Sequence, residues 1–477
     1  MKRRVLSFLL AASMVASLAA CGGTSEGSST DAPAAEEQTQ ETSGDTAEAT
    51  EPAGEEGKII NVYSWNEEFK NRLEFVYDQY DKTSEDGTIT YLKDGTEIHW
   101  TINPNQNGVY QTKLDEALLK QADASADEKI DIFLSETDYV TKYTDADADV
   151  ALPLTDIGIN PDTDLADQYP FTKVVASDIN GVQRGTTWQA CPCLFVYRRD
   201  IAKDALGTDD PDKVHEMVKD WATMKETAGK LKDKGYTVMA SYADTFRAYG
   251  NSISKPWVEA GSTEINVDQQ IVNWINDSKE WLDAGYFDPK VKGQWNDDWY
   301  KTMGSKSKSF GFLLPAWGID FVVKPNWDGK DGSWAATDGP QAFNWGGSFI
   351  HACTGTDNPQ HIKDIMLAFT GNKENLMAVT KEFVEFGNTM SGMKEIAEDD
   401  SFGADFLGGE NPYKYFTPAA DKITMATLSS YDQGCVELIQ SSFTDYFDGN
   451  VDFEKAKANF ETAIKERYPE ITAINWP

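Results

Sequence analysis

Aromatic and acidic side chains recur together at points where apolar, strand-like stretches of this sequence end. Trp65-Asn66-Glu67 follows IINVYS, and Pro315-Ala316-Trp317-Gly318-Ile319-Asp320 closes FGFLLP. A flat indole can cover the C–H face of a sugar ring, and Asp, Glu or Asn can accept hydrogen bonds from hydroxyl groups at its rim. An organic amine would suit the same residues, because indole faces attract cations and carboxylates neutralise them. The residue types therefore predict binding of a sugar or of an amine.

The candidate contacts share a position just after a predicted strand or in a segment that links two sets of strands. In open α/β sheets this is where ligands bind. The candidates are Trp65, Asn66, Glu67, Asp138, Trp188, Tyr242, Asp244, Trp257, Trp317, Asp320 and Trp345. Other tryptophans, such as Trp221, Trp274 and Trp281, recur at helical spacing and are expected to pack in the interior.

Catalytic and cofactor motifs are not found in the sequence. A zinc-protease helix needs a second histidine where Lys219 follows His215 at i+4, and an ammonium group cannot bind zinc. The acidic run at residues 145–149 has Val150 where a calcium loop needs glycine, so a solvated turn is expected. No nucleophile elbow, Walker loop or dinucleotide glycine pattern occurs. We expect no metal, no cofactor and no enzyme activity, although a glycosidase carboxylate pair is defined by its spacing in space and stays open.

Four cysteines follow Cys21, and their state is open at this stage. Cys191 and Cys193 lie in one segment that links strand sets, Cys353 lies in a second such segment, and Cys435 lies near the C-terminus. An exported protein can form disulfides, and a bridge between the two linking segments is one alternative. Small buried thiols are the other.

Strand-like and helix-like stretches alternate along the whole chain. Strands are expected at 59–65, 130–135, 193–200, 236–242 and 309–315, and helices at 66–80, 108–123, 210–235, 268–285, 358–371, 373–387 and 452–468. This alternation predicts an α/β fold with parallel sheets covered by helices. Residues 59–477 exceed the size of a typical single domain, so two lobes are expected. Linking segments at 186–207 and 342–360 would make each lobe discontinuous in sequence.

The N-terminus carries an export signal. Lys2, Arg3 and Arg4 precede an apolar stretch, and small residues follow it. Leu18-Ala19-Ala20-Cys21 resembles the lipobox of bacterial lipoproteins, which implies cleavage before Cys21 and lipidation of its thiol. Residues 24–58 are rich in Ser, Thr, Ala, Gly, Pro and acid, and cannot bury enough apolar surface to fold. We therefore expect a signal peptide over 1–20 and a lipidated, disordered acidic tether over 21–58.

The formal net charge of the 477-residue chain is −36 at pH 7. Such a surface repels nucleic acid phosphates and anionic lipids, which excludes both as general partners. Beyond the signal, no apolar run is long enough for a membrane helix.

In order and spacing, several segments resemble the extracellular solute-binding proteins of carbohydrate ABC transporters, with the maltodextrin-binding type as the model. These segments are the lipobox, the tether, IINVYSWNEEF, DIFLSETDYV, WQACPCLFVYRRDIAKDALG and FNWGGSFIHACTGTDNPQHIKDIMLAFT. The resemblance implies a periplasmic-binding-protein-like fold, with two discontinuous α/β lobes joined by a hinge and a ligand cleft between them. The expected lobes are 59–190 with 350–395, and 191–349 with 396–477.

The resemblance also implies a function and site residues. It implies high-affinity binding of a sugar or oligosaccharide outside the cytoplasmic membrane, delivery to an ABC permease, and a monomer held to the cell envelope through its lipid. It matches Asp138, Asp244 and Trp317 to binding positions, adds Gln189 beside Trp188 and Trp345 at the hinge, and places Cys191 where the relatives have a hinge carboxylate. A polyamine or quaternary-amine receptor and, less favoured, a secreted glycosidase are the alternatives.

Overall fold

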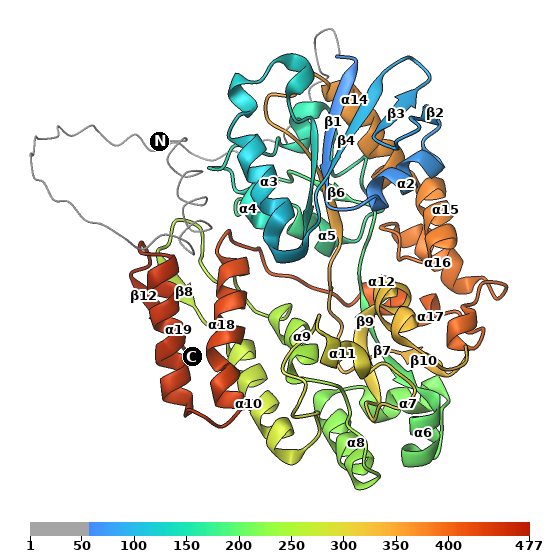
Figure 1. Ribbon diagram of the computed structural model, residues 1–477, viewed down its shortest axis with the longest axis vertical. Coiled ribbons are helices and arrows are strands. Elements are labelled where there is room, and N and C mark those ends of the chain that lie inside the picture. The colour runs from blue at the N-terminus through green and yellow to red at the C-terminus, as the bar shows by residue number, and fades with distance from the viewer. Residues whose placement is uncertain (1–56) are drawn as a thin grey trace, which may run out of the picture.

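The computed structural model describes residues 57–477 and arranges them as two α/β bodies, one above the other in Figure 1. The expected signal peptide and nearly all of the expected tether, including Cys21, lie outside the described residues. Within residues 57–477, no helix combines the length and apolar character required to cross a membrane. The α/β fold class expected from the alternation of strands and helices is confirmed.

The upper body in Figure 1 is built on a seven-stranded sheet in the order β2-β3-β4-β1-β5-β11-β6. Its strands are β1 (Ile59–Ser64), β2 (Tyr80–Thr83), β3 (Ile89–Leu92), β4 (Glu97–Ile102), β5 (Ile132–Glu136), β6 (Thr186–Thr187) and β11 (Ser348–Ala352). The central strand β1 pairs in parallel with β4 and β5, whereas β2, β3, β6 and β11 pair antiparallel with their neighbours. The sheet is therefore mixed rather than wholly parallel. The antiparallel β2–β4 meander forms one edge, and the antiparallel strand β11 lies on the side of β5 away from β1.

Helices cover both faces of this sheet, and the burial of its strands follows from that. Ile132, Phe133, Leu134 and Ser135 are successive buried residues of β5, as expected for a strand covered on both faces. The helices of this body are α2 (Glu68–Val76), α3 (Val109–Leu118), α4 (Val140–Thr144), α5 (Pro170–Val175), α14 (Pro359–Met366) and α15 (Lys373–Phe383), with a π-helical turn, η7 (Leu367–Gly371), after α14. Four 3-10 turns complete it: η1 (Gln106–Gly108), η2 (Gln121–Asp123), η3 (Ala126–Glu128) and η4 (Leu154–Ile157).

The lower body has a three-stranded sheet in the order β10-β7-β9, and all its pairs are antiparallel. Its strands are β7 (Cys193–Arg198), β9 (Gly311–Pro315) and β10 (Trp334–Thr337), and a separate parallel pair joins β8 (Glu264–Asn266) to β12 (Ala473–Asn475). The expectation of parallel sheets is wrong for the three-stranded sheet, because β9 and β10 both run opposite to the buried central strand β7.

Residues 236–242 do not form the predicted strand. The carbonyl groups of Thr237 and Val238 accept hydrogen bonds from the backbone of Phe310 and Gly311, so the segment follows the start of β9 for only two residues. At Ser241 the chain turns, because the Ser241 hydroxyl accepts from the Ala243 N–H and the Asp244 carboxylate accepts from the Ser241 N–H. This capped turn starts η5 (Tyr242–Thr245) instead of prolonging a strand.

The lower body contains the remaining helices. They are α6 (Arg199–Leu206), α7 (Pro211–Val218), α8 (Trp221–Asp233), α9 (Phe246–Gly250), α10 (Gln269–Ala284), α11 (Asp297–Lys301), α12 (Ala316–Gly318), α13 (Lys324–Asn326), α16 (Met390–Glu398), α17 (Tyr413–Ala420), α18 (Asp432–Phe447) and α19 (Phe453–Arg467), with the turns η6 (Ile319–Val323) and η8 (Asp405–Leu407). The helix predicted over 210–235 is two helices, because Asp220 accepts from the Thr223 N–H and caps a new start.

The chain passes between the two sheets by three short segments: after β6, before β11 and after α15. These crossing segments, which we call C1 (188–192), C2 (338–347) and C3 (384–389), touch one another. The Gln189 and Gly387 backbones form an isolated antiparallel bridge, and the Pro192 and Asn344 backbones form another. Residues far apart in sequence are therefore brought together at the level where the bodies meet.

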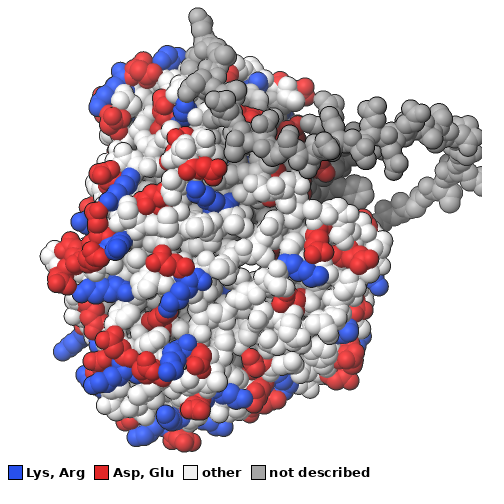
Figure 2. All heavy atoms as spheres, turned by 180° about the vertical axis from the view of Figure 1, so that it is seen from behind, with Lys and Arg blue, Asp and Glu red and all other residues white. Residues whose placement is uncertain are grey.

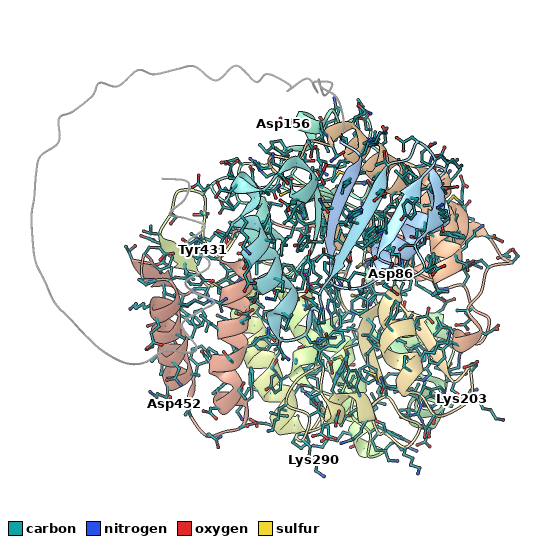
Figure 3. All side chains as sticks on the ribbon, turned by 45° about the horizontal axis from the view of Figure 1, so that its top comes forward. Asp86, Asp156, Lys203, Lys290, Tyr431 and Asp452 are labelled. Carbon is teal, nitrogen blue, oxygen red and sulfur yellow. The ribbon has the colours of Figure 1, made fainter. Side chains whose placement is uncertain are left out.

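Charges of both signs are interspersed on the outside. Figure 2 shows Lys and Arg next to Asp and Glu along one side and the base of the face seen from behind, with few charges at its centre. In Figure 3, the labelled Lys203, Lys290 and Asp452 lie at the rim of the lower body. The charges of residues 57–477 are thus spread over the outside and partly paired, as Lys203 pairs with Asp209 at 2.9 Å.

Candidate ligand-binding site

Trp317 lies in α12, directly after β9, as its position behind FGFLLP predicts. Its indole Nε1 donates to the carbonyl oxygen of Trp345 at 3.2 Å, which fixes the ring against C2. Gly346 (φ +89°) lies against the same ring, and a Cβ at this position would be 3.2 Å from the indole. Glycine is therefore required here both for the backbone conformation and for the close approach.

Trp317 belongs to an aromatic cluster with Trp295, Trp299 and Trp345. The Trp295 and Trp317 rings are nearly parallel, at 14° with centroids 6.4 Å apart, and Trp345 stands across both, at 77° and 75°. Trp295 packs in turn on Trp299, with centroids 5.4 Å apart. Trp345 is buried, whereas Trp295 is half exposed. Trp295 was not predicted, because it stands in a loop between two helices rather than after a strand.

An ion pair joins the two bodies beside this cluster. Arg247 of α9 donates from both terminal nitrogens to the Asp138 carboxylate, at 2.5 and 2.6 Å. Its guanidinium also lies over the Trp345 ring, 4.9 Å from the centroid. Asp138 follows β5, as the sequence predicts. Arg247 was not predicted, since no spacing in the sequence marks it.

The charges at this junction alter the protonation of its acids. Burial opposes ionisation of Asp138, but the charge and hydrogen bonds of Arg247 prevail and lower the Asp138 pKa. Burial, reinforced by the charge of Asp138, raises the pKa of Glu136 to about 8. The Glu136 carboxylate also accepts from the Asp138 N–H at 3.2 Å. A carboxyl group held partly protonated near neutral pH can both donate and accept hydrogen bonds.

Trp65, Asn66 and Glu67 lie at the same edge of the seven-stranded sheet as Asp138, because β1 and β5 are parallel neighbours. Trp65 meets Tyr110 edge to face, with centroids 5.4 Å apart. Asn66 accepts from the Glu68 N–H at 2.9 Å and so helps to start α2. Glu67 is exposed. The structure thus brings the first predicted loop to the junction, with Trp65 partly packed and Glu67 free to reach solvent.

A buried carboxylate network ties the crossing segments to α2. Glu385 of C3 accepts from Arg72 Nε at 2.9 and 3.0 Å, from Trp188 Nε1 at 3.0 Å and from Gln189 Nε2 at 2.9 Å. Gln189 also donates to Glu68 at 2.7 Å. Burial raises the pKa of Glu385 to about 7, against the lowering by Arg72. A carboxylate therefore does stand among the crossings, but it comes from Glu385 rather than from the position of Cys191.

Several other predicted contacts are turned inward. Trp188 has no exposed surface and packs on Phe69 and Phe369. Trp257, 3 % exposed, packs on Phe460 of α19. The Tyr242 side chain is buried, and its hydroxyl donates to the Lys292 carbonyl at 3.0 Å.

Asp244 and Asp320 are held by protein groups. Asp244 is buried, and its carboxylate accepts from Gln294 Nε2, Trp299 Nε1 and the Ser241 N–H at 2.8 to 2.9 Å. Burial raises the Asp244 pKa to about 6 despite these hydrogen bonds. Asp320, in the π-helical turn η6, accepts from Lys324 at 3.2 Å. The placement of Asp244 gives it a structural role, and Asp320 keeps a partly exposed carboxylate.

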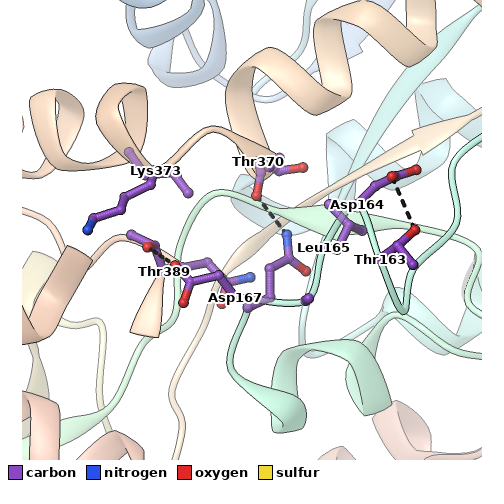
Figure 4. Close-up of a pocket in the computed structure, with 12 residues that line it drawn as sticks. Thr163, Asp164, Leu165, Asp167, Thr370, Lys373 and Thr389 are labelled. Carbon is purple, nitrogen blue, oxygen red and sulfur yellow. Dashed lines mark hydrogen bonds between the residues drawn. The ribbon is translucent and has the colours of Figure 1, made fainter. Parts of the chain in front are cut away.

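A separate cavity of about 190 Å³ lies beside α15 and C3 (Figure 4). It is lined by residues 163–168, Thr370, Gly371, Lys373, Leu376, Asn388 and Thr389. Its polar groups are largely engaged: Asp167 accepts from Thr389 and Ser391, and Lys373 pairs with Glu395. None of the predicted contacts lines it.

The cysteines and acids show no redox or metal arrangement within residues 57–477. Cys191, Cys193, Cys353 and Cys435 are buried free thiols, so the disulfide alternative is not realised. In the same part of the chain, no group of three or more His, Cys, Asp or Glu side chains is placed to hold a metal ion.

Comparison with known proteins gives one family and many similar folds. A family model described as bacterial extracellular solute-binding protein matches residues 96–405. An extracellular solute-binding protein of family 1 superposes with a TM-score of 0.69 at 17 % identity, over 87 % of this chain and 100 % of that one. No curated protein matches the sequence.

Two further similar structures are described in terms of sugar binding. An ABC-transporter-associated binding protein from B. animalis subsp. lactis Bl-04 in complex with β-1,6-galactobiose has a TM-score of 0.63 at 18 % identity, over 88 % of this chain and 100 % of that one. The sugar-binding protein MalE from Xanthomonas citri has a TM-score of 0.64 at 14 % identity, over 87 % and 97 %. At these identities the similarity shows the fold, which is that of the periplasmic-binding-protein type.

Proposed function

The chain belongs to the bacterial extracellular solute-binding proteins, and on that premise we propose that it binds a neutral sugar or oligosaccharide and delivers it to an ABC permease. The proposal of a sugar rests on one observation. The cluster of Trp295, Trp317 and Trp345 lies directly beside the Asp138–Arg247 pair, where the two bodies meet. Indole faces for C–H groups and ionised groups for hydroxyls then stand side by side. One similar structure holds β-1,6-galactobiose and another is described as a sugar-binding protein, which supports the same ligand class.

Charge compensation favours a neutral ligand over an amine. Arg247 already occupies the cation position over the Trp345 ring, with Asp138 as its counterion. A polyamine or quaternary amine is therefore the weaker candidate.

We also propose that binding closes two lobes about a hinge formed by C1, C2 and C3. Their bounds are those expected from the sequence, 59–190 with 350–395 and 191–349 with 396–477, except that all of β11 belongs to the upper lobe and all of α16 to the lower lobe. The Asp138–Arg247 pair joins groups from both sides of that hinge and would be made when the lobes close. In this scheme the protein binds as a monomer and performs no chemistry on its ligand.

A thermal-shift panel followed by calorimetry tests the ligand. Neutral mono- and oligosaccharides, uronic acids, polyamines and quaternary amines are compared at equal concentration. We expect stabilisation by a neutral sugar only. Stabilisation by an amine alone would replace the sugar, and release of smaller sugars from a bound oligosaccharide on long incubation would establish a glycosidase.

Anchoring through Cys21 has its own test. We propose that the signal over 1–20 is removed and that Cys21 is lipidated, which holds the protein to the outer face of the cytoplasmic membrane. Cys21→Ala should leave the protein unlipidated and either released or with its signal uncleaved, with sugar affinity unchanged. A Cys21→Ala protein that still carries acyl chains and fractionates with membranes would contradict the lipobox.

A further inference from the structure

Trp295 adopts a backbone conformation that its side chain does not favour. Its φ is +63°, in the left-handed region where a bulky non-glycine residue is an outlier. The side chain is 50 % exposed, so burial of the ring does not account for the conformation. Outliers of this kind persist when the surroundings impose them, and they cluster at functional sites.

The surroundings of Trp295 impose the conformation from both sides. Before it, Gln294 donates to the buried Asp244 carboxylate at 2.9 Å. After it, Asn296 caps α11 by accepting from the Trp299 N–H at 3.1 Å, and Trp299 Nε1 donates to the same Asp244 oxygen at 2.8 Å. Asp244, predicted as a ligand contact, thus positions the loop that presents Trp295.

The two parallel rings differ in how firmly they are held. Trp317 is anchored by its hydrogen bond to the Trp345 carbonyl and by contact with Gly346. Within residues 57–477, no group hydrogen-bonds to the indole nitrogen of Trp295, and its ring packs on the rings of Trp299, Trp317 and Trp345. Trp295 is therefore the ring that can move while Trp317 stays in place.

A sugar ring can enter between the two indoles only if they move apart. A pyranose between two indoles makes two layers of contact of roughly 3.5–4.0 Å each, so the ring planes must stand about 7–8 Å apart. The Trp295 and Trp317 centroids are 6.4 Å apart at 14°. The centroid distance is the upper limit of the separation between nearly parallel ring planes, so Trp295 must move outward to admit one sugar ring.

We propose that Trp295 is a second stacking wall, which moves away from Trp317 and holds one pyranose ring of the ligand between the two indoles. This rests on the proposed function and narrows its ligand class. Both faces of the enclosed ring must be apolar. A pyranose with all its hydroxyls equatorial has axial C–H groups on both faces, whereas an axial hydroxyl makes one face polar. The enclosed ring is therefore of the all-equatorial type.

Calorimetry tests whether Trp295 forms this second stacking wall, with the oligosaccharide that binds best in the thermal-shift panel as the ligand. We expect Trp295→Ala to weaken binding about 10-fold and Trp295→Phe about threefold, since a smaller ring keeps part of the stacking. Phe75→Ala is the matched control: Phe75 is 49 % exposed, lies on α2 of the other body and is expected to leave affinity unchanged. Unchanged or tighter binding by Trp295→Ala would show that the ring only covers Trp317 and would overturn the proposal.

A second variant separates binding from folding. Trp295→Gly relieves the left-handed strain, so its melting temperature should equal or exceed that of the natural protein while its sugar affinity falls as for Trp295→Ala. A drop in melting temperature with unchanged affinity in the folded fraction would make the ring structural and refute the wall. Near-UV circular dichroism of the natural protein should change when the sugar enters between the stacked indoles.

The ligand class is tested with oligosaccharides that differ only in configuration at one carbon. All-equatorial rings should bind more tightly than rings with an axial hydroxyl, and Trp295→Ala should reduce that preference. An equal loss of affinity for both configurations in Trp295→Ala would overturn the all-equatorial ligand class. If the natural protein binds no sugar at all, the proposed function itself fails, whereas sugar binding that is insensitive to Trp295 defeats only this inference.

Discussion

A binding role and a packing role for Trp317 predict different effects of its replacement by alanine. Trp317→Ala should weaken sugar binding by roughly 2–4 kcal/mol, or about 30- to 1000-fold, because it removes a stacking face fixed by the Trp345 carbonyl. The melting temperature without ligand should stay near normal, since the ring is only partly buried. Calorimetry and thermal unfolding measure the two effects. A strongly lowered melting temperature with intact affinity would assign the ring to the core.

Glu136 gives the stability a pH dependence of known sign. Its pKa in the folded protein, about 8, lies above the ordinary value of 4.5, so between these values the folded state binds more protons than the unfolded state. The contribution of Glu136 therefore makes the protein less stable as pH rises from about 4.5 to about 8. Glu136→Gln should flatten this part of the profile, measured by urea unfolding at several pH values. An identical slope in the variant would show that other groups cause it.

Helix α15 ends at a strained residue, which is a property of the element and its connection to C3. Val384 has φ +54°, and a β-branched residue is rarely found in this region. Left-handed termination favours Gly or Asn. Val384→Gly or Val384→Asn should therefore keep or raise the melting temperature, although each removes apolar surface. Val384→Ala is the control, since it loses the branch but not the strain. A lower melting temperature for both Gly and Asn would mean that the side chain contributes more than the strain costs.

The segment between α17 and α18 links the two bodies by packing. Met425 and Leu428 contact a small cluster in the upper body that contains Val140, Val175 and Phe349, while Met425 also packs on the core of the lower body. The bodies are thus joined by this contact as well as by the three crossings. This apolar contact and the Asp138–Arg247 ion pair therefore both lie at the junction between the two bodies.

At the scale of the whole molecule, folding and binding should reside in the described part of the chain. A chain that begins at Lys58 is expected to melt at the same temperature as the mature protein and to bind its sugar with the same affinity. The physical reason is that residues 24–58 contain almost no apolar side chains to contribute to a core. Calorimetry on both chains checks this, and a large loss of affinity in the shorter chain would contradict it.

The sequence by itself determined the local elements and part of the site. Apolar periodicity identified β1, β5, β7 and β9 and the long helices α10 and α19, because burial on one or both faces imposes a repeat that can be counted. Position after a strand marked Asp138 and Trp317 as candidates, because ligands of open α/β sheets bind where strands end. The family followed from the order of its segments.

Only the tertiary structure decided which side chains meet across the chain. Arg247 pairs with Asp138 from 109 residues away, and Arg72 reaches Glu385 over 313 residues. Strand direction in the β10-β7-β9 sheet and the inward turn of Trp188, Asp244 and Trp257 likewise depend on how the elements pack. Local sequence sets the period of a helix or strand, but a side chain's partners depend on the register between elements, which is fixed only when the two bodies form.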